Sequence, residues 1–136
     1  MTVVLDTDVI VAALVANGLC REVLHRTIRL RAFATSEPLF RELETTLRRK
    51  FTVTPATATF LSRLRSSVRF VEPIPMDKPV CRDATDDMVL ATALAAQAEA
   101  IVTGDDDLLV LRSYAGIAII SPRTFLEKLD GSSGRS

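Results

Sequence analysis

Acidic residues follow the apolar segments of this chain at the points where strands are expected to end. Residues 3–5 are apolar and stop at Asp6, and residues 100–103 are followed by Gly104 and three aspartates at 105–107. Because parallel strands end at a common edge of a sheet, where ligands bind, acids far apart in the sequence would meet there. Close carboxylates repel unless a cation joins them, and Mg²⁺ or Mn²⁺ are the usual choice. The pattern predicts an α/β fold with a metal site at a sheet edge.

Apolar strand segments alternate with segments of helical character along the whole chain. The expected strands are residues 2–6, 32–35, 68–71, 100–103 and 117–120. The expected helices are residues 8–16, 20–29, 36–49, 54–66, 86–98 and 121–129. The strands are continuously apolar, as strands covered on both faces are. Repeated strand–helix units therefore predict a central parallel sheet with helices on both sides.

Length and composition indicate one globular domain. The chain has 136 residues, of which 48% are hydrophobic and 25% charged, and this suits a single core. We expect the domain to span residues 1–130 and the Gly/Ser-rich tail, 131–136, to be disordered. No apolar run has the ~18 residues of a membrane span, and no signal peptide is evident. The two isolated cysteines, Cys20 and Cys81, are typical of a cytoplasmic protein.

The net charge of zero conceals a strong division along the chain. Residues 21–69 hold eleven basic and four acidic residues, a net charge of +7, and residues 70–111 hold two basic and nine acidic residues, a net charge of −7. Such a division is compatible with nucleic-acid contact beside an acidic centre, but also with solvated helix faces. Arginine outnumbers lysine by 14 to 3, which favours phosphate binding because guanidinium binds phosphate in a bidentate manner.

Some of the acids have ordinary structural explanations and others do not. Asp8 and Asp86 could cap helices. Asp6 directly follows a strand, so its side chain belongs at the sheet edge. Asp87 lies on one helical line with Ala91 and Leu94, and an acid on a packing face needs a partner. Of the two glutamates in the expected helix 36–49, periodicity does not choose between Glu42 and Glu44.

Four segments in order resemble the PIN-domain ribonucleases. They are Val-Val-Leu-Asp-Thr-Asp at 3–8, Leu-Phe-Arg-Glu-Leu at 39–43, Cys-Arg-Asp-Ala-Thr-Asp-Asp at 81–87 and Val-Thr-Gly-Asp-Asp-Asp-Leu at 102–108. The resemblance covers about residues 2–129, and the group most similar is the PIN-family toxin component of bacterial toxin–antitoxin systems. It implies a three-layer α/β/α sandwich and a metal-dependent ribonuclease that uses Mg²⁺ or Mn²⁺. It also implies an RNA substrate, an antitoxin partner and a homodimer.

The resemblance also implies which acids form the site. The catalytic and metal-binding positions correspond to Asp6, Glu42, Asp87 and Asp105, with Asp107 as a further metal ligand. Asp86 and Asp87 are both candidates for the third catalytic position. Asp87 is preferred because its separation from Asp105 matches the family pattern without a gap. The family usually has asparagine where this chain has Asp8, which adds a negative charge beside the site.

Two other functions share part of this pattern. Asp6-Thr7-Asp8 after a strand also resembles the nucleophile motif of haloacid-dehalogenase-type phosphatases. In those enzymes a second Asp follows four residues after the Gly-Asp motif, where this chain has Leu109. The other alternative is a non-catalytic PIN-like module that binds RNA or protein. A metal-dependent ribonuclease is the predicted function.

Overall fold

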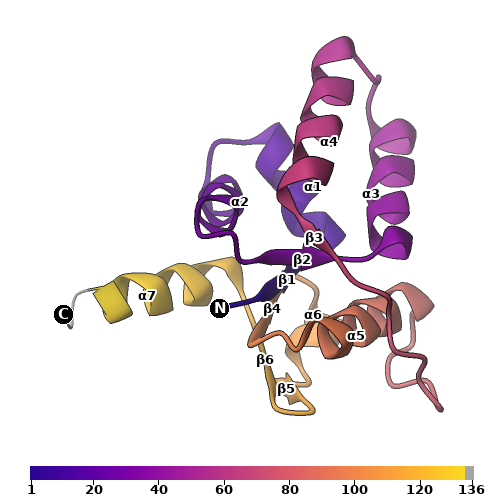
Figure 1. The fold of residues 1–136 in the computed structure, drawn as a ribbon, viewed down its shortest axis with the longest axis vertical. Helices are drawn as coiled ribbons and strands as arrows, with labels where there is room; N and C mark the ends of the chain where they lie inside the picture. The colour runs from indigo at the N-terminus through magenta and orange to yellow at the C-terminus, as the bar shows by residue number, and fades with distance from the viewer. Residues whose placement is uncertain (134–136) are drawn as a thin grey trace.

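A computed structural model describes residues 1–133 and contains six strands and seven helices within them. Figure 1 shows their arrangement. The elements are β1 (Val3–Leu5), α1 (Thr7–Val15), α2 (Leu19–Arg29), β2 (Phe33–Thr35), α3 (Glu37–Lys50), α4 (Pro55–Ser67), β3 (Arg69–Phe70), α5 (Ala84–Ala96), β4 (Ala100–Val102), α6 (Asp106–Leu109), β5 (Ser113–Tyr114), β6 (Ile117–Ile120) and α7 (Pro122–Ser133).

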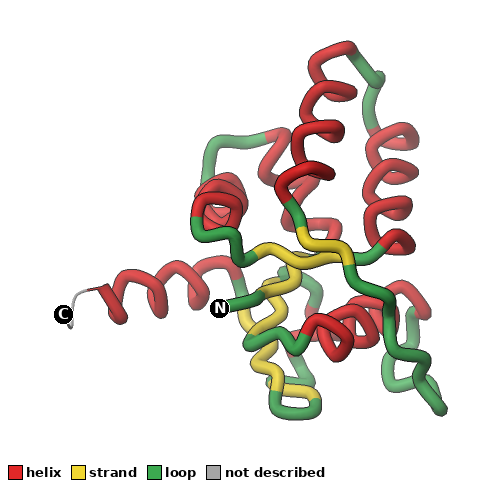
Figure 2. Tube along the Cα trace, in the orientation of Figure 1, coloured by secondary structure: helices red, strands yellow, loops and turns green. Residues whose placement is uncertain are grey.

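The strands form one sheet in the order β3-β2-β1-β4-β6-β5, in which all neighbours are parallel except β5 and β6. β1 lies at the centre, where Val4 is opposite Ala34 of β2 and Ile101 of β4. Figure 2 shows the short strands between the helical layers. The α/β class with a mostly parallel sheet is confirmed, and the antiparallel edge strand β5 is an addition to it.

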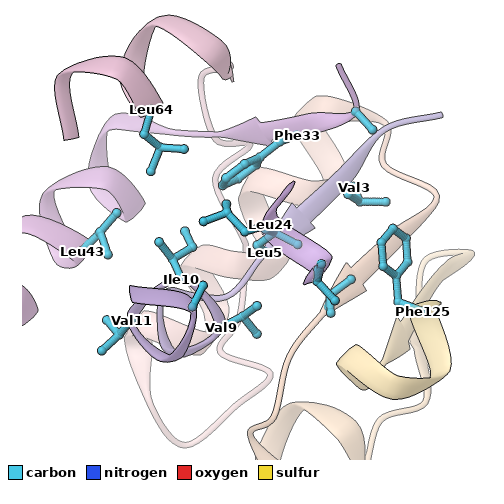
Figure 3. Close-up of a cluster of buried hydrophobic side chains, with 14 of the residues drawn as sticks. Val3, Leu5, Val9, Ile10, Val11, Leu24, Phe33, Leu43, Leu64 and Phe125 are labelled. Carbon is cyan, nitrogen blue, oxygen red and sulfur yellow. The ribbon is translucent and has the colours of Figure 1, made fainter. Parts of the chain in front are cut away.

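Both faces of the sheet are covered by helices, so the structure has three layers. Val3 and Leu5 belong to a core with α1, α2, α3 and α7, whereas Val4 faces a second core with α5. Figure 1 shows α1–α4 on one side of the sheet and α5 on the other, and Figure 3 shows the packing of the larger core around Leu5 and Phe33. Burial on both faces explains why the strands are continuously apolar instead of alternating.

Strands β1, β4 and β6 end side by side. The backbone N–H of Asp6 donates to Val102 of β4 at 3.0 Å, and that of Thr103 donates to Ile120 of β6 at 3.0 Å. The first residues after β1 and β4 therefore lie at one edge of the sheet. This confirms the expectation that acids about a hundred residues apart in sequence would meet.

Several element boundaries differ from the expected ones. α5 begins two residues earlier than expected because the Asp83 side chain accepts a hydrogen bond from the N–H of Thr85 at 2.9 Å. α7 continues to Ser133 instead of ending at Leu129, so part of the expected tail is helical. The rest of that tail, residues 134–136, lies outside the described residues. Two short elements, α6 and β5, were not expected.

One exposed arginine joins α4 to α3 and β3. Arg65 binds both oxygens of Glu37, at 2.6 and 3.2 Å. Its guanidinium also lies over the rings of Phe40 and Phe70, 4.5 and 4.9 Å from their centroids. Planar guanidinium groups stack on aromatic faces in this manner. This arginine of the positive stretch therefore has a structural role.

Replacing Arg65 with glutamate is expected to lower the melting temperature by a few degrees. The change removes the stacked cation and places a carboxylate opposite Glu37. Arg49→Glu makes the same change of charge on an exposed side chain of α3 and should alter the melting temperature by less than about 1 °C. Thermal melts by circular dichroism compare the two variants. Equal melting temperatures would contradict a structural role for Arg65.

Within residues 1–133, no helix is long and apolar enough to cross a membrane.

Candidate active site

The floor of the site is a buried hydrogen-bond chain between two strand ends. The Thr103 hydroxyl donates to Asp6 Oδ2 at 2.7 Å and accepts from the backbone N–H of Asp105 at 3.0 Å. Thr103 is fully buried and Asp6 is 6% exposed. Asp6 stands at the N-cap position of α1, but its side chain makes no capping hydrogen bond. It is directed to the neighbouring strand end, as expected for a site residue and not for a cap.

Thr103→Val is expected to destabilise the protein by about 1–3 kcal/mol, because it leaves a buried carboxylate oxygen and a backbone N–H without their partner. Thr103→Ser keeps the hydroxyl and should cost about 1 kcal/mol or less, from the lost methyl group. Urea unfolding of both variants gives the two free energies. If serine is as harmful as valine, the hydroxyl does not carry the interaction.

Three aspartates meet above this floor. Oxygen atoms of Asp86, Asp105 and Asp107 all lie within 4.8 Å of one another. We call these three residues the acid cluster. Asp105 Oδ1 also accepts from the backbone N–H of Asp107 at 2.9 Å and so caps the short helix α6. Hard oxygen ligands at this spacing suit a divalent ion such as Mg²⁺ or Mn²⁺.

The electrostatics of the site favour a cation. Burial, together with the neighbouring charges of Asp105 and Asp6, raises the pKa of Asp86 to about 7. Burial likewise raises the pKa of Asp6 to about 6, despite the hydrogen bond from Thr103. The half-buried Cys81 has a pKa of about 11, because of burial and the nearby charge of Asp87. Each of these shifts disfavours negative charge, and a bound cation would reverse that preference.

The two candidates for the third acid lie in different surroundings. Asp86 faces Asp105 and is 5% exposed. Asp87 is directed elsewhere: its Oδ1 accepts from the backbone N–H of Cys81 at 2.8 Å and of Val80 at 3.2 Å. Asp87 also lines a cavity of about 480 Å³ between α5 and the proline-rich loop of residues 71–80. Asp86 and Leu90 belong to the buried face of α5, whereas Asp87 is only half-buried.

The two glutamates of α3 lie in different surroundings. Glu44 lines a groove of about 380 Å³ with Leu47 of α3 and Arg65 of α4. Glu42 is half-buried and accepts from the Thr46 hydroxyl at 3.5 Å, on its own helix. Neither contact decides between the two glutamates, and Glu42 as the fourth acid stays a prediction.

Two further charged residues act on the site. Asp8 is exposed in the first turn of α1, where its charge contributes to the raised pKa of Asp6. Arg82, which the sequence analysis did not single out, forms an ion pair with Asp107 at 2.6 Å. The pair spans 25 residues, so local sequence gave no signal for it.

An open parallel sheet whose carboxyl edge carries clustered acids is the arrangement of a metal-binding α/β protein. The sequence model of the PIN domain family matches residues 2–107, which is most of the chain. This chain therefore belongs to the PIN domain family, whose members are generally metal-dependent nucleases. The match to the PIN domain family excludes the alternative of a haloacid-dehalogenase-type phosphatase.

A solved structure has the same fold. PAE2754 from Pyrobaculum aerophilum aligns with a TM-score of 0.61 and 22% identity, over 96% of this chain and 90% of that one. At this identity the likeness concerns the fold alone. No curated protein sequence matches the chain significantly.

Proposed function

We propose that this protein is a divalent-metal-dependent ribonuclease that hydrolyses RNA phosphodiester bonds. The observation that carries the proposal is the acid cluster, in which Asp86, Asp105 and Asp107 lie within 4.8 Å of one another beside the buried Asp6. Acids clustered and partly buried at the functional edge of an α/β sheet destabilise the metal-free protein, so their presence there indicates a functional role. Metal binding is such a role, and it matches the family.

Each residue of the site has a role in this proposal. Asp86, Asp105 and Asp107 would hold Mg²⁺ or Mn²⁺, which lowers the pKa of bound water and offsets the charge of the phosphate when bound. Asp6 is largely ionised at pH 7, since its pKa is about 6, and can accept a proton from the attacking water. Thr103 holds one Asp6 oxygen and so orients the other. Glu42 remains in the proposal as a further ligand.

Exposed basic side chains would hold the RNA backbone. Arg48, Arg49 and Lys50 end α3 and are exposed, and none of them takes part in an ion pair among residues 1–133. They are better candidates than Arg65, which is engaged with Glu37 and two aromatic rings. Phosphate contacts of this kind make the affinity fall with increasing salt.

The biological setting that we propose is a cytoplasmic toxin–antitoxin pair, in which this chain is the toxin. It rests on the four sequence segments that resemble PIN-family toxins, and it includes a cognate antitoxin and a homodimer as partners. Co-expression with the product of a small neighbouring gene tests it: the neighbour should relieve growth arrest and co-purify with this chain. Growth that is unaffected by expression of an active nuclease would refute the toxin role.

The ribonuclease activity is tested with RNA and p-nitrophenyl phosphate side by side. We expect cleavage of single-stranded RNA with Mn²⁺ or Mg²⁺, none in EDTA, and no phosphatase activity. Undiminished RNA cleavage in EDTA would refute the metal mechanism. Phosphatase activity alone would refute the ribonuclease function, and RNA binding without cleavage would favour a non-catalytic module.

A further inference from the structure

The loop before α5 is tied down on both sides of Arg82. On one side, the Asp87 carboxylate accepts hydrogen bonds from the backbone N–H groups of Val80 and Cys81, at 3.2 and 2.8 Å. On the other, Asp83 caps α5 through the N–H of Thr85 at 2.9 Å. A carboxylate that accepts two successive backbone N–H groups restrains the chain strongly. The backbone that presents Arg82 is therefore held in place.

Arg82 reaches from this loop to the edge of the acid cluster. Its Nη2 atom donates to Asp107 Oδ1 at 2.6 Å, and its side chain is 86% exposed. Among the ion pairs of residues 1–133, this is the one that joins a cation to a cluster acid. A guanidinium has five N–H donors, so donors remain for a ligand at the cluster.

Stability does not account for this ion pair. Pairs between exposed side chains contribute little to folding, because water and salt screen them. A cation at this position has a clear use if RNA is the substrate. The acid cluster repels phosphate, and an adjacent guanidinium opposes that repulsion and matches two phosphate oxygens with its planar fork.

We propose that Arg82 binds a phosphate of the RNA at the acid cluster and that Asp87 is the positioning residue that holds its loop. The inference rests on the proposed ribonuclease function and extends it to a substrate contact. It also gives Asp87 a role other than metal ligation. Arg82 binds the substrate backbone and Asp87 acts through Arg82, so the two residues form one functional unit.

A double-mutant cycle on RNA affinity tests the coupling. Binding of a fluorescent single-stranded RNA is measured in EDTA across salt concentrations, so that neither metal nor cleavage enters. Arg82→Ala should weaken RNA binding about tenfold and should lower the salt dependence of the affinity by the equivalent of about one phosphate contact. The affinity of Arg82→Lys should lie between those of wild type and Arg82→Ala. Asp87→Ala should weaken binding similarly, and the double variant should be no worse than either single one.

Arg49→Ala is the matched control, since it also removes one exposed arginine but is not adjacent to the Asp87 loop. Its effect should add to that of Asp87→Ala instead of overlapping with it. If Asp87→Ala lowers the melting temperature, the milder Asp87→Asn, which keeps one acceptor oxygen, replaces it in the cycle. Additive effects of Arg82 and Asp87, or unchanged RNA affinity in Arg82→Ala, would overturn the proposal.

Calorimetric titration with Mn²⁺ alone separates positioning from metal ligation. Both Arg82→Ala and Asp87→Ala should bind Mn²⁺ within threefold of wild type. Loss of Mn²⁺ binding in Asp87→Ala would make Asp87 a ligand and overturn its positioning role. In cleavage assays, Arg82→Ala should raise KM with little change in kcat. If wild type binds RNA through Arg82 but does not cleave it, the ribonuclease function fails while the contact stands.

Discussion

Asp86→Asn should reduce RNA cleavage at least a hundredfold, whereas Asp87→Asn should cost about tenfold, mainly through KM. Asp86 is buried in the acid cluster, and Asp87 binds the backbone of residues 80 and 81. Removing one ligand of a catalytic ion removes stabilisation at the reacting phosphate, for which losses of about 10²–10³ are typical. Steady-state kinetics with Mn²⁺ at pH 8 measures kcat and KM separately.

The exposed Asp106 supplies the control for this pair, because it lies in the same acidic triplet but outside the cluster. Asp106→Asn should retain nearly full activity, and Asp105→Asn should be as inactive as Asp86→Asn. If Asp87→Asn is inactive and Asp86→Asn is active, Asp87 is the catalytic acid, as the sequence separation from Asp105 predicted, and the placement of Asp86 in the cluster is not functional.

Asp86→Asn should also raise the melting temperature of the metal-free protein at pH 8, on the order of 5 °C, and should raise it by less than half as much at pH 5. The pKa of Asp86 is about 7 in the folded protein and near 3.8 without its surroundings. Between these values the folded state holds a proton that the unfolded state releases. The stability of the metal-free wild type therefore falls as the pH rises from about 4 to 7, and the full cost of ionising Asp86 in the folded protein is present above pH 7.

At pH 8, Mn²⁺ should reverse the order of the melting temperatures of wild type and Asp86→Asn. Wild type gains stability because the ion binds only the folded cluster, and the variant loses most of this gain. At pH 5 the response of wild type should be small, since protons compete for the same oxygens. Calorimetric melts at both pH values, in EDTA and in Mn²⁺, measure all four conditions. A less stable Asp86→Asn in EDTA at pH 8 would indicate that this acid is structural.

Much of the fold followed from local patterns. The apolar runs at 3–5, 33–35 and 100–102 became the central strands, and the long helices lie where periodicity and Ser or Pro signals indicated. The missed elements, α6 with four residues and β5 with two, span only about one period of a helix or strand, so no repeating pattern can show in them. They depend on contacts with β6 that have no local signature.

The third acid shows the limit of periodicity. Successive residues of a helix differ by about 100° in direction, so the choice between Asp86 and Asp87 required the orientation of α5 against the sheet. The helix begins at Ala84 because Asp83 caps it, and packing of Val89 and Leu90 then turns Asp86 inward. A motif locates such a site to within a residue, and the rotation of the helix selects the side chain.

The sequence by itself determined the fold class, the family and the sheet edge at which Asp6 and Asp105 meet, because these depend on strand order and on what ends each strand. Only the tertiary structure decided that Asp86 enters the cluster, that Asp87 holds a loop and that Arg82 pairs with Asp107. Those contacts join segments up to 25 residues apart through side-chain directions. Side-chain direction is set by the packing of whole elements, which no local pattern of residues encodes.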